Sequence, residues 1–269
     1  MWAIRIVHVP GQARKDRRVL IPEIVIRLLA ERERQHGRGK KEDFRSRHCV
    51  SLSFDEMSDL PRFDSDFRRQ FRELLIWRRD VRRFQCTPLP SGLLQELLAL
   101  ACLAPSVGLS EPWRFVHVDS DEARLEVIAE FERANAAALV DLSGDRASLY
   151  AKLKLAGLRE APVHLAVFTD RTTAKGYGLG RQTMPETLDY SVVAAIHTLW
   201  LAARTVGVGL GWVSILDPRR ITSILQVPDG WSLTAYLCLG YPEEEMDFPE
   251  LERAGWERRA GLDQRILAR

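Results

Sequence analysis

A dense run of arginines is the first candidate for chemistry. Arg78, Arg79, Arg82 and Arg83 place four guanidinium groups within six residues, with Asp80 between them. A guanidinium is always charged, and its planar fork of donors fits a phosphate or a carboxylate. The run therefore indicates a site for an anionic group, although a solvated basic helix end is an alternative explanation. Asp80 is then either a salt-bridge partner or a site carboxylate with a tuned pKa.

Two turns that are rich in glycine and proline form a second group of candidates. Residues 104–112 predict a rigid turn in which backbone N–H groups and the Ser106 hydroxyl face a polar ligand edge. Residues 207–214 predict a glycine-rich entry to a strand, where the backbone can approach a flat ligand closely. Trp212 and Ser214 would point to one face of that strand, because side chains alternate with a period of two.

A third glycine-rich segment lies at residues 176–186. It contains neither GxxxxGK-S/T nor a GxGxxG turn inside a strand–turn–helix unit. A flexible loop over residues 170–185 that lies over a pocket is the better interpretation. No HExxH, CxxC or GxSxG sequence indicates a metal site or a serine hydrolase. His117, His164 and His197 stand singly among apolar residues, so we expect core histidines and no bound metal.

The composition excludes several classes of protein. With 269 residues, of which 46% are hydrophobic and 28% charged, the chain can bury a sizeable core. No apolar run approaches the ~20 residues needed to span a bilayer, so we expect no membrane partner. The N-terminus lacks the order of a secretory signal, and four well-separated cysteines indicate a reducing compartment. The predicted location is therefore the cytoplasm.

The charge is distributed unevenly along the chain. Residues 1–49 carry a net charge of +7, which leaves −5 for the remainder because the total is +2. Residues 1–60 are therefore predicted to be a basic, poorly ordered extension or the result of a start upstream of Met57. Residues 61–269 are predicted to be the functional domain. A nucleic-acid-binding arm is an alternative, but no aromatic residues alternate with the charges, so we expect no nucleic-acid partner.

Helical and strand patterns alternate from residue 67 onward. The predicted helices are 67–79, 93–103, 121–139, 151–158, 186–205 and 218–225, and the predicted strands are 113–118, 163–168, 208–216 and 233–239. The helix at 186–205 is apolar on most sides, as is typical of a helix buried in a core or between subunits. This order of elements predicts an α+β layer fold with one sheet under several helices.

Several of these stretches carry a resemblance to a known family. They are Arg78–Arg82, Ala104–Gly108, Pro112–Phe115, Lys154–Pro162, Gly178–Pro185, Gly211–Ser214, Gly240–Glu245 and Glu252–Trp256. Together they resemble the flavin-dependent nitroreductase superfamily, and more narrowly its 5,6-dimethylbenzimidazole synthase branch. The resemblance implies a nitroreductase-like α+β fold for residues 61–269, with a mixed, mainly antiparallel sheet flanked by helices. It also implies an intertwined homodimer that binds FMN between its subunits.

The resemblance assigns cofactor-binding residues one by one. Arg78, Arg79 and Arg82 would hold the FMN phosphate and ribityl chain, with Asp80 and Val81 of the same run at the site. Ser106 would contact the isoalloxazine edge, and Trp212 and Ser214 would contribute from the strand. Arg258 or Arg259 would be a C-terminal phosphate ligand, and the spacing leaves that choice open. Residues 170–185 would form a lid.

The resemblance further implies a reaction that consumes its flavin. Reduced FMN and O2 would yield 5,6-dimethylbenzimidazole, the lower ligand of cobalamin, and erythrose 4-phosphate. Asp80 and Ser214 would be the catalytic pair, the first moving protons and the second bonding to the flavin edge. The closed lid would leave no room for a nicotinamide, so a separate flavin reductase would supply reduced FMN.

Two other functions fit part of the sequence. An NAD(P)H-dependent nitroreductase or flavin reductase would share the fold, the arginine run and the turn that contains Ser106. A non-catalytic protein would use the basic extension to bind nucleic acid. Steady oxidation of NADPH would favour the first, and DNA binding lost with residues 1–56 would favour the second.

Overall fold

The computed structural model describes residues 61–140, 143–153 and 155–269, and the segment Asp64–Arg269 forms one compact unit. Residues 1–60, predicted to be a basic extension, lie outside the described residues. In chain order the elements are α2 (Ser65–Trp77), α3 (Leu93–Ala101), η1 (Val107–Leu109), β1 (Trp113–His117), α4 (Asp121–Val140), α5 (Gly144–Tyr150), β2 (Val163–Asp170), α6 (Thr187–Thr205), β3 (Gly209–Val213), α7 (Pro218–Ile224), β4 (Trp231–Gly240), α8 (Glu250–Arg253) and η2 (Leu262–Arg265).

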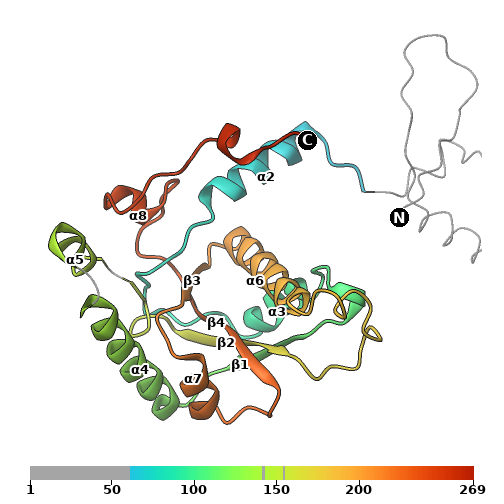
Figure 1. Cartoon of the computed structure of the whole chain (residues 1–269). Helices are drawn as coiled ribbons and strands as arrows, with labels where there is room; N and C mark the ends of the chain where they lie inside the picture. Colours follow the sequence, from blue (N-terminus) through green and yellow to red (C-terminus); the bar gives the residue numbers. More distant parts are fainter. Residues whose placement is uncertain (1–60, 141–142, 154) are drawn as a thin grey trace, which may run out of the picture. The chain divides into compact units, whose positions relative to one another are not determined.

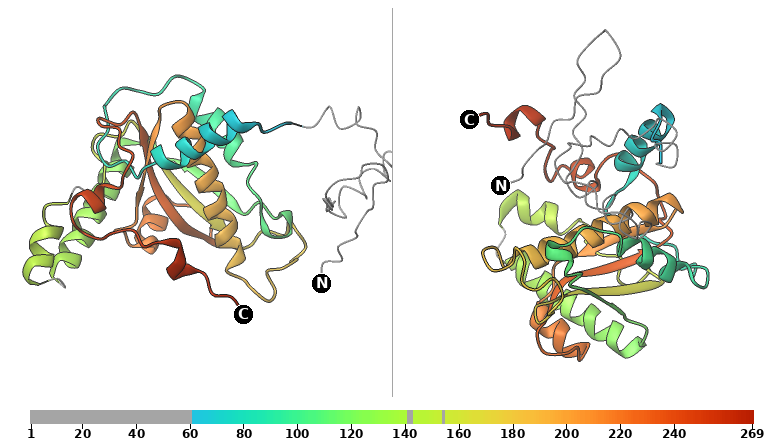
Figure 2. Two further views of the ribbon diagram at one scale, coloured as in Figure 1. Left: turned by 90° about the horizontal axis from the view of Figure 1, so that it is seen from above. Right: turned by 90° about the vertical axis from the view of Figure 1, so that its right-hand side faces the viewer.

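A four-stranded sheet lies at the centre of this unit (Figure 1). Its strands follow the order β1-β2-β4-β3, and each neighbouring pair is antiparallel. A parallel bridge between Asp80 and Leu210 adds a short segment to the outer edge of β3. Helices cover both faces (Figure 2). The predicted mainly antiparallel sheet flanked by helices is therefore confirmed.

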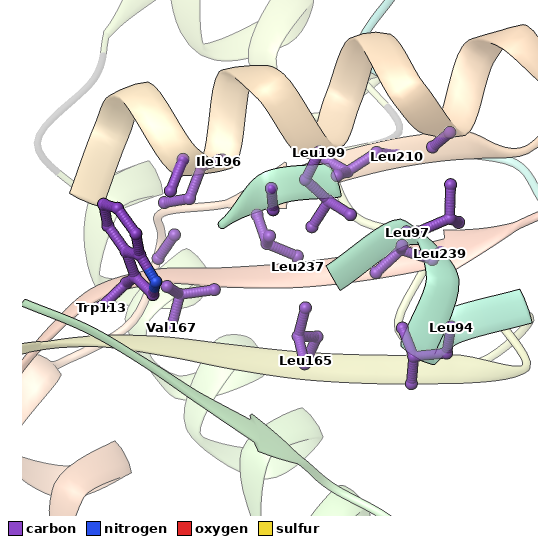
Figure 3. Packing of buried hydrophobic residues seen from close by; sticks show 14 of the residues in the cluster. Leu94, Leu97, Trp113, Leu165, Val167, Ile196, Leu199, Leu210, Leu237 and Leu239 are labelled. Atoms are coloured by element: carbon purple, nitrogen blue, oxygen red, sulfur yellow. The ribbon is translucent and has the colours of Figure 1, made fainter. Parts of the chain in front are cut away.

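Each face of the sheet has its own hydrophobic core. The central strand β2 is buried over its whole length, as its continuous apolar run from residue 163 to 168 predicts. Helices α3 and α6 pack on one face through Leu97, Ile196 and Leu199 (Figure 3). Helices α4 and α7 pack on the other face, and Val127 and Ile221 belong to that second core. The site therefore rests on a sheet that is supported from both sides.

Helix α6 runs between the two parts of the domain that carry candidate site residues. Its buried side chains recur every three or four residues, and they are Leu188, Ser191, Val192, Ala195, Ile196, Leu199 and Ala203. The opposite face leaves Tyr190 57% and Val193 41% exposed, so only one stripe of this apolar helix is covered within the chain. In the part of the chain that the structure describes, no helix is long and apolar enough to cross a membrane.

One predicted helix is wrong. The segment 151–158 was expected to be helical, but the helix lies just before it, as α5, and the segment itself, residue 154 aside, is irregular. Gly157 lies in a close contact within this irregular segment. A Cβ atom at this position would lie only 2.4 Å from Cδ2 of the buried Phe84 ring. The backbone therefore packs directly against an aromatic ring, which the local sequence does not reveal.

The expectation of three core histidines holds for one of them. His164 is 1% exposed, and its Nδ1 atom lies 2.9 Å from the Tyr236 hydroxyl. Burial lowers the pKa of His164 to about 4, so this imidazole is neutral at pH 7. His117 and His197 are exposed, which contradicts the prediction for both. Strand β1 presents His117 outward, and His197 lies on the uncovered face of α6.

Candidate functional site

The arginine run lies along the outer edge of β3. After α2 ends, the Val81 N–H donates to the Leu210 carbonyl over 3.0 Å, and the run pairs with the strand in parallel. A Cβ atom on Gly211 would lie 2.1 Å from the Val81 carbonyl oxygen, so only glycine permits this approach. The sequence predicted that the glycines of β3 make room for a flat ligand. In the structure the backbone of the arginine run fills that room.

Asp80 is held firmly against β3. Its Oδ1 atom accepts a hydrogen bond from the Trp212 N–H over 2.9 Å, and its Oδ2 atom accepts one from Arg82 Nε over 2.8 Å. Hydrogen bonds to both oxygens therefore fix the orientation of this side chain. Ser214 is exposed and directly follows β3, two residues beyond Trp212, so the structure brings the predicted catalytic pair to the same end of one strand.

The arginines of the run fall into two classes. Arg82 is paired with Asp80, and Arg83 Nη1 is paired with Glu250 over 2.6 Å. Within the described residues, no carboxylate lies within ion-pair distance of Arg78 or Arg79. The guanidinium of Arg78 lies 4.6 Å from the centre of the Trp200 ring. The guanidinium of Arg79 donates to the carbonyl oxygens of residues 78 and 247.

A third arginine without an ion pair among the described residues is Arg259, which lies outside the run. Burial lowers the pKa of both Arg78 and Arg79, and the positive charge of Arg259 lowers each further. The Arg79 Nε atom is buried and has no hydrogen-bond partner among the described residues. Three neighbouring positive charges and one buried donor without an acceptor raise the free energy of the folded protein unless an anion binds to them. We call Arg78, Arg79 and Arg259 the cation cluster, and its donors fit a phosphate such as that of FMN.

Two adjoining clefts open at the arginine run. Both are lined by Arg79, Val81, Glu244 and Met246. Between them they also include Arg78, Asp80 and Arg82, so all five residues predicted from this run line a cleft. Ser106, Trp212, Ser214, Arg258 and Arg259 line neither of the two.

Comparison with known proteins agrees with this geometry. Residues 75–241 match the model of the "Nitroreductase family". The chain belongs to the nitroreductase family. It is 56% identical over 199 residues to a protein from Rhodospirillum rubrum named 5,6-dimethylbenzimidazole synthase, covering 74% of this chain and 94% of that protein. A protein of the same name from Rhodobacter capsulatus is 49% identical, covering 72% of this chain and 94% of that protein.

Among solved structures, this nitroreductase-family chain resembles oxidised iodotyrosine deiodinase bound to FMN and 3-iodo-L-tyrosine. The TM-score is 0.55 at 25% identity, with 65% of this chain and 91% of the other covered. The resemblance stated from sequence motifs, and the expectation of an enzyme of the flavin-dependent nitroreductase type, are therefore confirmed.

The turn that contains Ser106 forms a second, separate group. Ser106 Oγ accepts a hydrogen bond from the Glu111 N–H over 3.1 Å, and the Val107 N–H donates to Ser191 Oγ over 3.0 Å. Ser191 is near the start of α6, whereas Trp200, near its end, donates from Nε1 to the Arg79 carbonyl. Nine helical residues separate these two contacts by about 14 Å. One chain therefore holds Ser106 and the arginine run at opposite ends of α6.

The predicted lid, residues 170–185, packs on the Ser106 turn. A Cβ atom on Gly176 would lie 2.6 Å from the Gly108 carbonyl oxygen, and Lys175 forms an ion pair with Glu111. At the base of the lid, buried Asp170 accepts from Arg114 Nη2 over 2.6 Å and from the Thr172 N–H over 2.9 Å. Neither cleft is lined by residues of this loop. Within one chain the loop therefore covers the Ser106 turn and not the arginine run.

Sequence reasoning missed two residues that shape the cation cluster. Trp200 supports Arg78 through its ring and Arg79 through its Nε1–H. The carbonyl of Asp247 accepts from Arg79 Nη2. A tryptophan on an otherwise apolar helix was the available signal for Trp200, but a backbone carbonyl leaves no trace in the residue type. In the described part of the chain, no group of three or more His, Cys, Asp or Glu residues could hold a metal.

Proposed function

We propose that this chain is a 5,6-dimethylbenzimidazole synthase that converts reduced FMN and O2 to 5,6-dimethylbenzimidazole and erythrose 4-phosphate. The observation that carries the proposal is the 56% identity to the Rhodospirillum rubrum protein of that name, over 94% of its length. Reduced FMN supplies both the electrons for O2 and the carbon atoms of the product. The residues of this chain bind it, orient it and move protons.

The cation cluster is the proposed phosphate site. Arg79 Nε is buried without a partner, and the charges of Arg78 and Arg259 lie close enough to influence one another. A phosphate oxygen would satisfy the donor and neutralise the repulsion. We assign Arg259 as the C-terminal ligand because its positive charge lowers the pKa values of Arg78 and Arg79.

Asp80 is the proposed proton carrier and Ser214 the proposed flavin-edge donor. Both Asp80 oxygens accept hydrogen bonds beside the arginine run, and in this proposal the side chain would act as a base. It takes a proton while the ribityl chain is cleaved and returns it afterwards. The Trp212 N–H and Arg82 keep its oxygens oriented. The exposed Ser214 hydroxyl remains available for a hydrogen bond to the ring.

A homodimer is the proposed assembly. Helix α2 has no buried residue, and Phe67, Phe71, Leu75 and Trp77 of its apolar side are each about two-fifths exposed. A second copy of the chain would remove this surface from water. The separation of Ser106 from the arginine run has the same consequence. A site that needs both groups would draw them from two subunits, with Trp212 and Ser214 beside the flavin.

Several broader features complete the proposal. The lid would exclude a nicotinamide, so a separate flavin reductase would supply reduced FMN. Cys86 and Cys102 are exposed free thiols, which supports a cytoplasmic location. Residues 61–269 would form the FMN-binding domain without the basic extension. A chain that starts at Met57 should therefore keep full activity.

The direct test is to mix the purified protein with chemically reduced FMN in air and to measure 5,6-dimethylbenzimidazole by mass spectrometry. We expect protein-dependent product, which Asp80→Asn abolishes while FMN binding persists. The matched control Asp119→Asn, at an exposed position outside the site, should keep full activity. Recovery of intact, reoxidised FMN, together with steady oxidation of NADPH, would instead identify an ordinary nitroreductase.

A further inference from the structure

Trp256 lies at the point where the C-terminal segment leaves the body of the domain. Helix α8 ends, and Gly255 adopts a left-handed φ of +76° that reverses the chain. The Trp256 N–H then donates to the Leu251 carbonyl over 2.9 Å. This turn gives the indole ring a defined starting direction.

The Trp256 ring packs on a platform that α4 and α5 build. Its centre lies 6.1 Å from the centre of the Tyr150 ring, and the Arg146 guanidinium lies 4.9 Å from it. The Tyr150 hydroxyl donates to Asn135 Oδ1 over 2.7 Å, which ties the platform to α4. An aromatic pair and a cation–π contact together provide a modest but specific anchor.

The residues that follow have little else to hold them. From residue 257 to 263 every side chain is exposed, whereas Trp256 is partly buried. Arg259 lies three residues beyond the anchor, within about 10 Å of chain. The chain that leads to Trp256 also contacts the arginine run, because Arg79 Nη2 donates to the Asp247 carbonyl and Arg83 pairs with Glu250. The positive charges of Arg259, Arg78 and Arg79 repel one another. An untethered segment would carry Arg259 away from the other two arginines.

From this geometry we infer that Trp256 is a positioning residue, whose packing against Tyr150 and Arg146 holds Arg259 in the cation cluster. The inference rests on the proposed phosphate site. Trp256 itself touches no ligand. Its contribution to binding passes through Arg259, and it concerns the phosphate and not the flavin ring.

A double-mutant cycle tests this inference in the full chain. The dissociation constants of FMN and of riboflavin, which lacks the phosphate, are measured by flavin fluorescence for Trp256→Ala, Arg259→Ala and the double variant. Each single substitution should weaken FMN binding roughly 10-fold, the value of one charge-assisted hydrogen bond. The double variant should be no weaker than either single variant, because both remove the same contact. Riboflavin binding should not change.

Two further variants make the test specific. Trp256→Phe keeps an aromatic ring on Tyr150 and should restore most of the FMN affinity. Arg265→Ala removes another exposed arginine of the same segment and should have no effect. A general structural role for Trp256 would weaken FMN and riboflavin binding equally, which would overturn the inference.

The remaining outcomes separate the inference from the proposed function. If Arg79→Ala weakens FMN binding but the effects of Trp256→Ala and Arg259→Ala add, the phosphate site stands and the positioning role is wrong. If Arg79→Ala and Arg259→Ala both leave FMN binding unchanged, the phosphate site and the positioning role are both wrong.

Discussion

Two arginine-rich regions of this protein differ in whether their positive charges have negative partners. In the first, Arg133 and Arg220 converge on Glu130, whose side chain is 1% exposed. Both Glu130 oxygens accept hydrogen bonds, and Oε1 also accepts from the Asp217 N–H over 3.1 Å. In the second, Arg78 and Arg79 converge with Arg259, and Arg79 Nε donates to nothing among the described residues.

The difference separates charge that supports the fold from charge that awaits a ligand. Around Glu130 every positive group has a negative partner, and the network joins α4 to the start of α7. Removing it should cost stability and leave ligand binding intact. The cation cluster contributes little to stability, because its donors are incompletely used and its charges repel. Removing it should abolish affinity for a phosphate.

The largest expected effect is that of Arg79→Ala on ligand affinity. FMN binding should weaken roughly 100-fold, or about 3 kcal/mol, because the variant removes a buried donor aimed at the phosphate. The free energy of unfolding should fall by less than about 1 kcal/mol, since relief of repulsion offsets two lost hydrogen bonds to carbonyls. Isothermal titration and urea unfolding measure the two quantities. A large loss of stability with unchanged affinity would erase the contrast between the two regions.

The converse substitution, Glu130→Ala, should lower the free energy of unfolding by about 2 kcal/mol. The substitution leaves the Asp217 N–H without its acceptor and leaves Arg133 and Arg220 without their buried partner. FMN affinity should stay within about twofold. Glu132→Ala is the matched control on the same helix. Its ion pair with Arg159 is exposed on both sides, so its loss should cost under about 1 kcal/mol. Equal costs for the two substitutions would show that burial of Glu130 contributes nothing.

The stability of the protein at acid pH should also depend on the Glu130 carboxylate. The hydrogen bonds from Arg133 hold the pKa of Glu130 below its ordinary value of 4.5. A lowered folded-state pKa contributes stability above the unfolded-state pKa, and that stability is lost as the pH falls through the folded-state value. Glu130→Gln should therefore flatten the decline in stability below about pH 4.5. If stability falls equally steeply with decreasing pH in the wild-type protein and in Glu130→Gln, then Glu130 does not cause the decline.

The smallest expected effect is that of Arg258→Ala. Arg258 is exposed and is not part of the proposed cation cluster, so FMN affinity should change less than about twofold. Measured beside Arg259→Ala, this variant shows whether the C-terminal segment presents one arginine or both. If Arg258→Ala weakens FMN binding as much as Arg259→Ala does, Arg258 also belongs to the cation cluster.

Much of the fold was predictable because its signals are local. The apolar run of β2 and the helical run of apolar residues in α6 each predicted the observed element to within two residues at each end. The helix predicted at 151–158 is absent, and in that segment Gly157 packs against Phe84, a contact between residues far apart in the sequence that local patterns do not reveal.

The site was predictable in composition but not in arrangement. The residue types of the run from Arg78 to Arg82 indicated an anion site, and all five residues line a cleft. The sequence could not decide between Arg258 and Arg259, and we propose that this choice depends on where Trp256 packs. Nor could it show that the Ser106 turn and the arginine run contact α6 at residues about 14 Å apart along the helix. That separation follows from tertiary contacts at the two ends of one helix.

The central claim is that the cation cluster binds the phosphate of FMN, and an experimental structure of the FMN complex tests it most directly. Arg79 Nε should donate to a phosphate oxygen within about 3 Å, with Arg78 and Arg259 close to the same group. A phosphate held by other residues, with Arg79 Nε still lacking a partner, would contradict the claim.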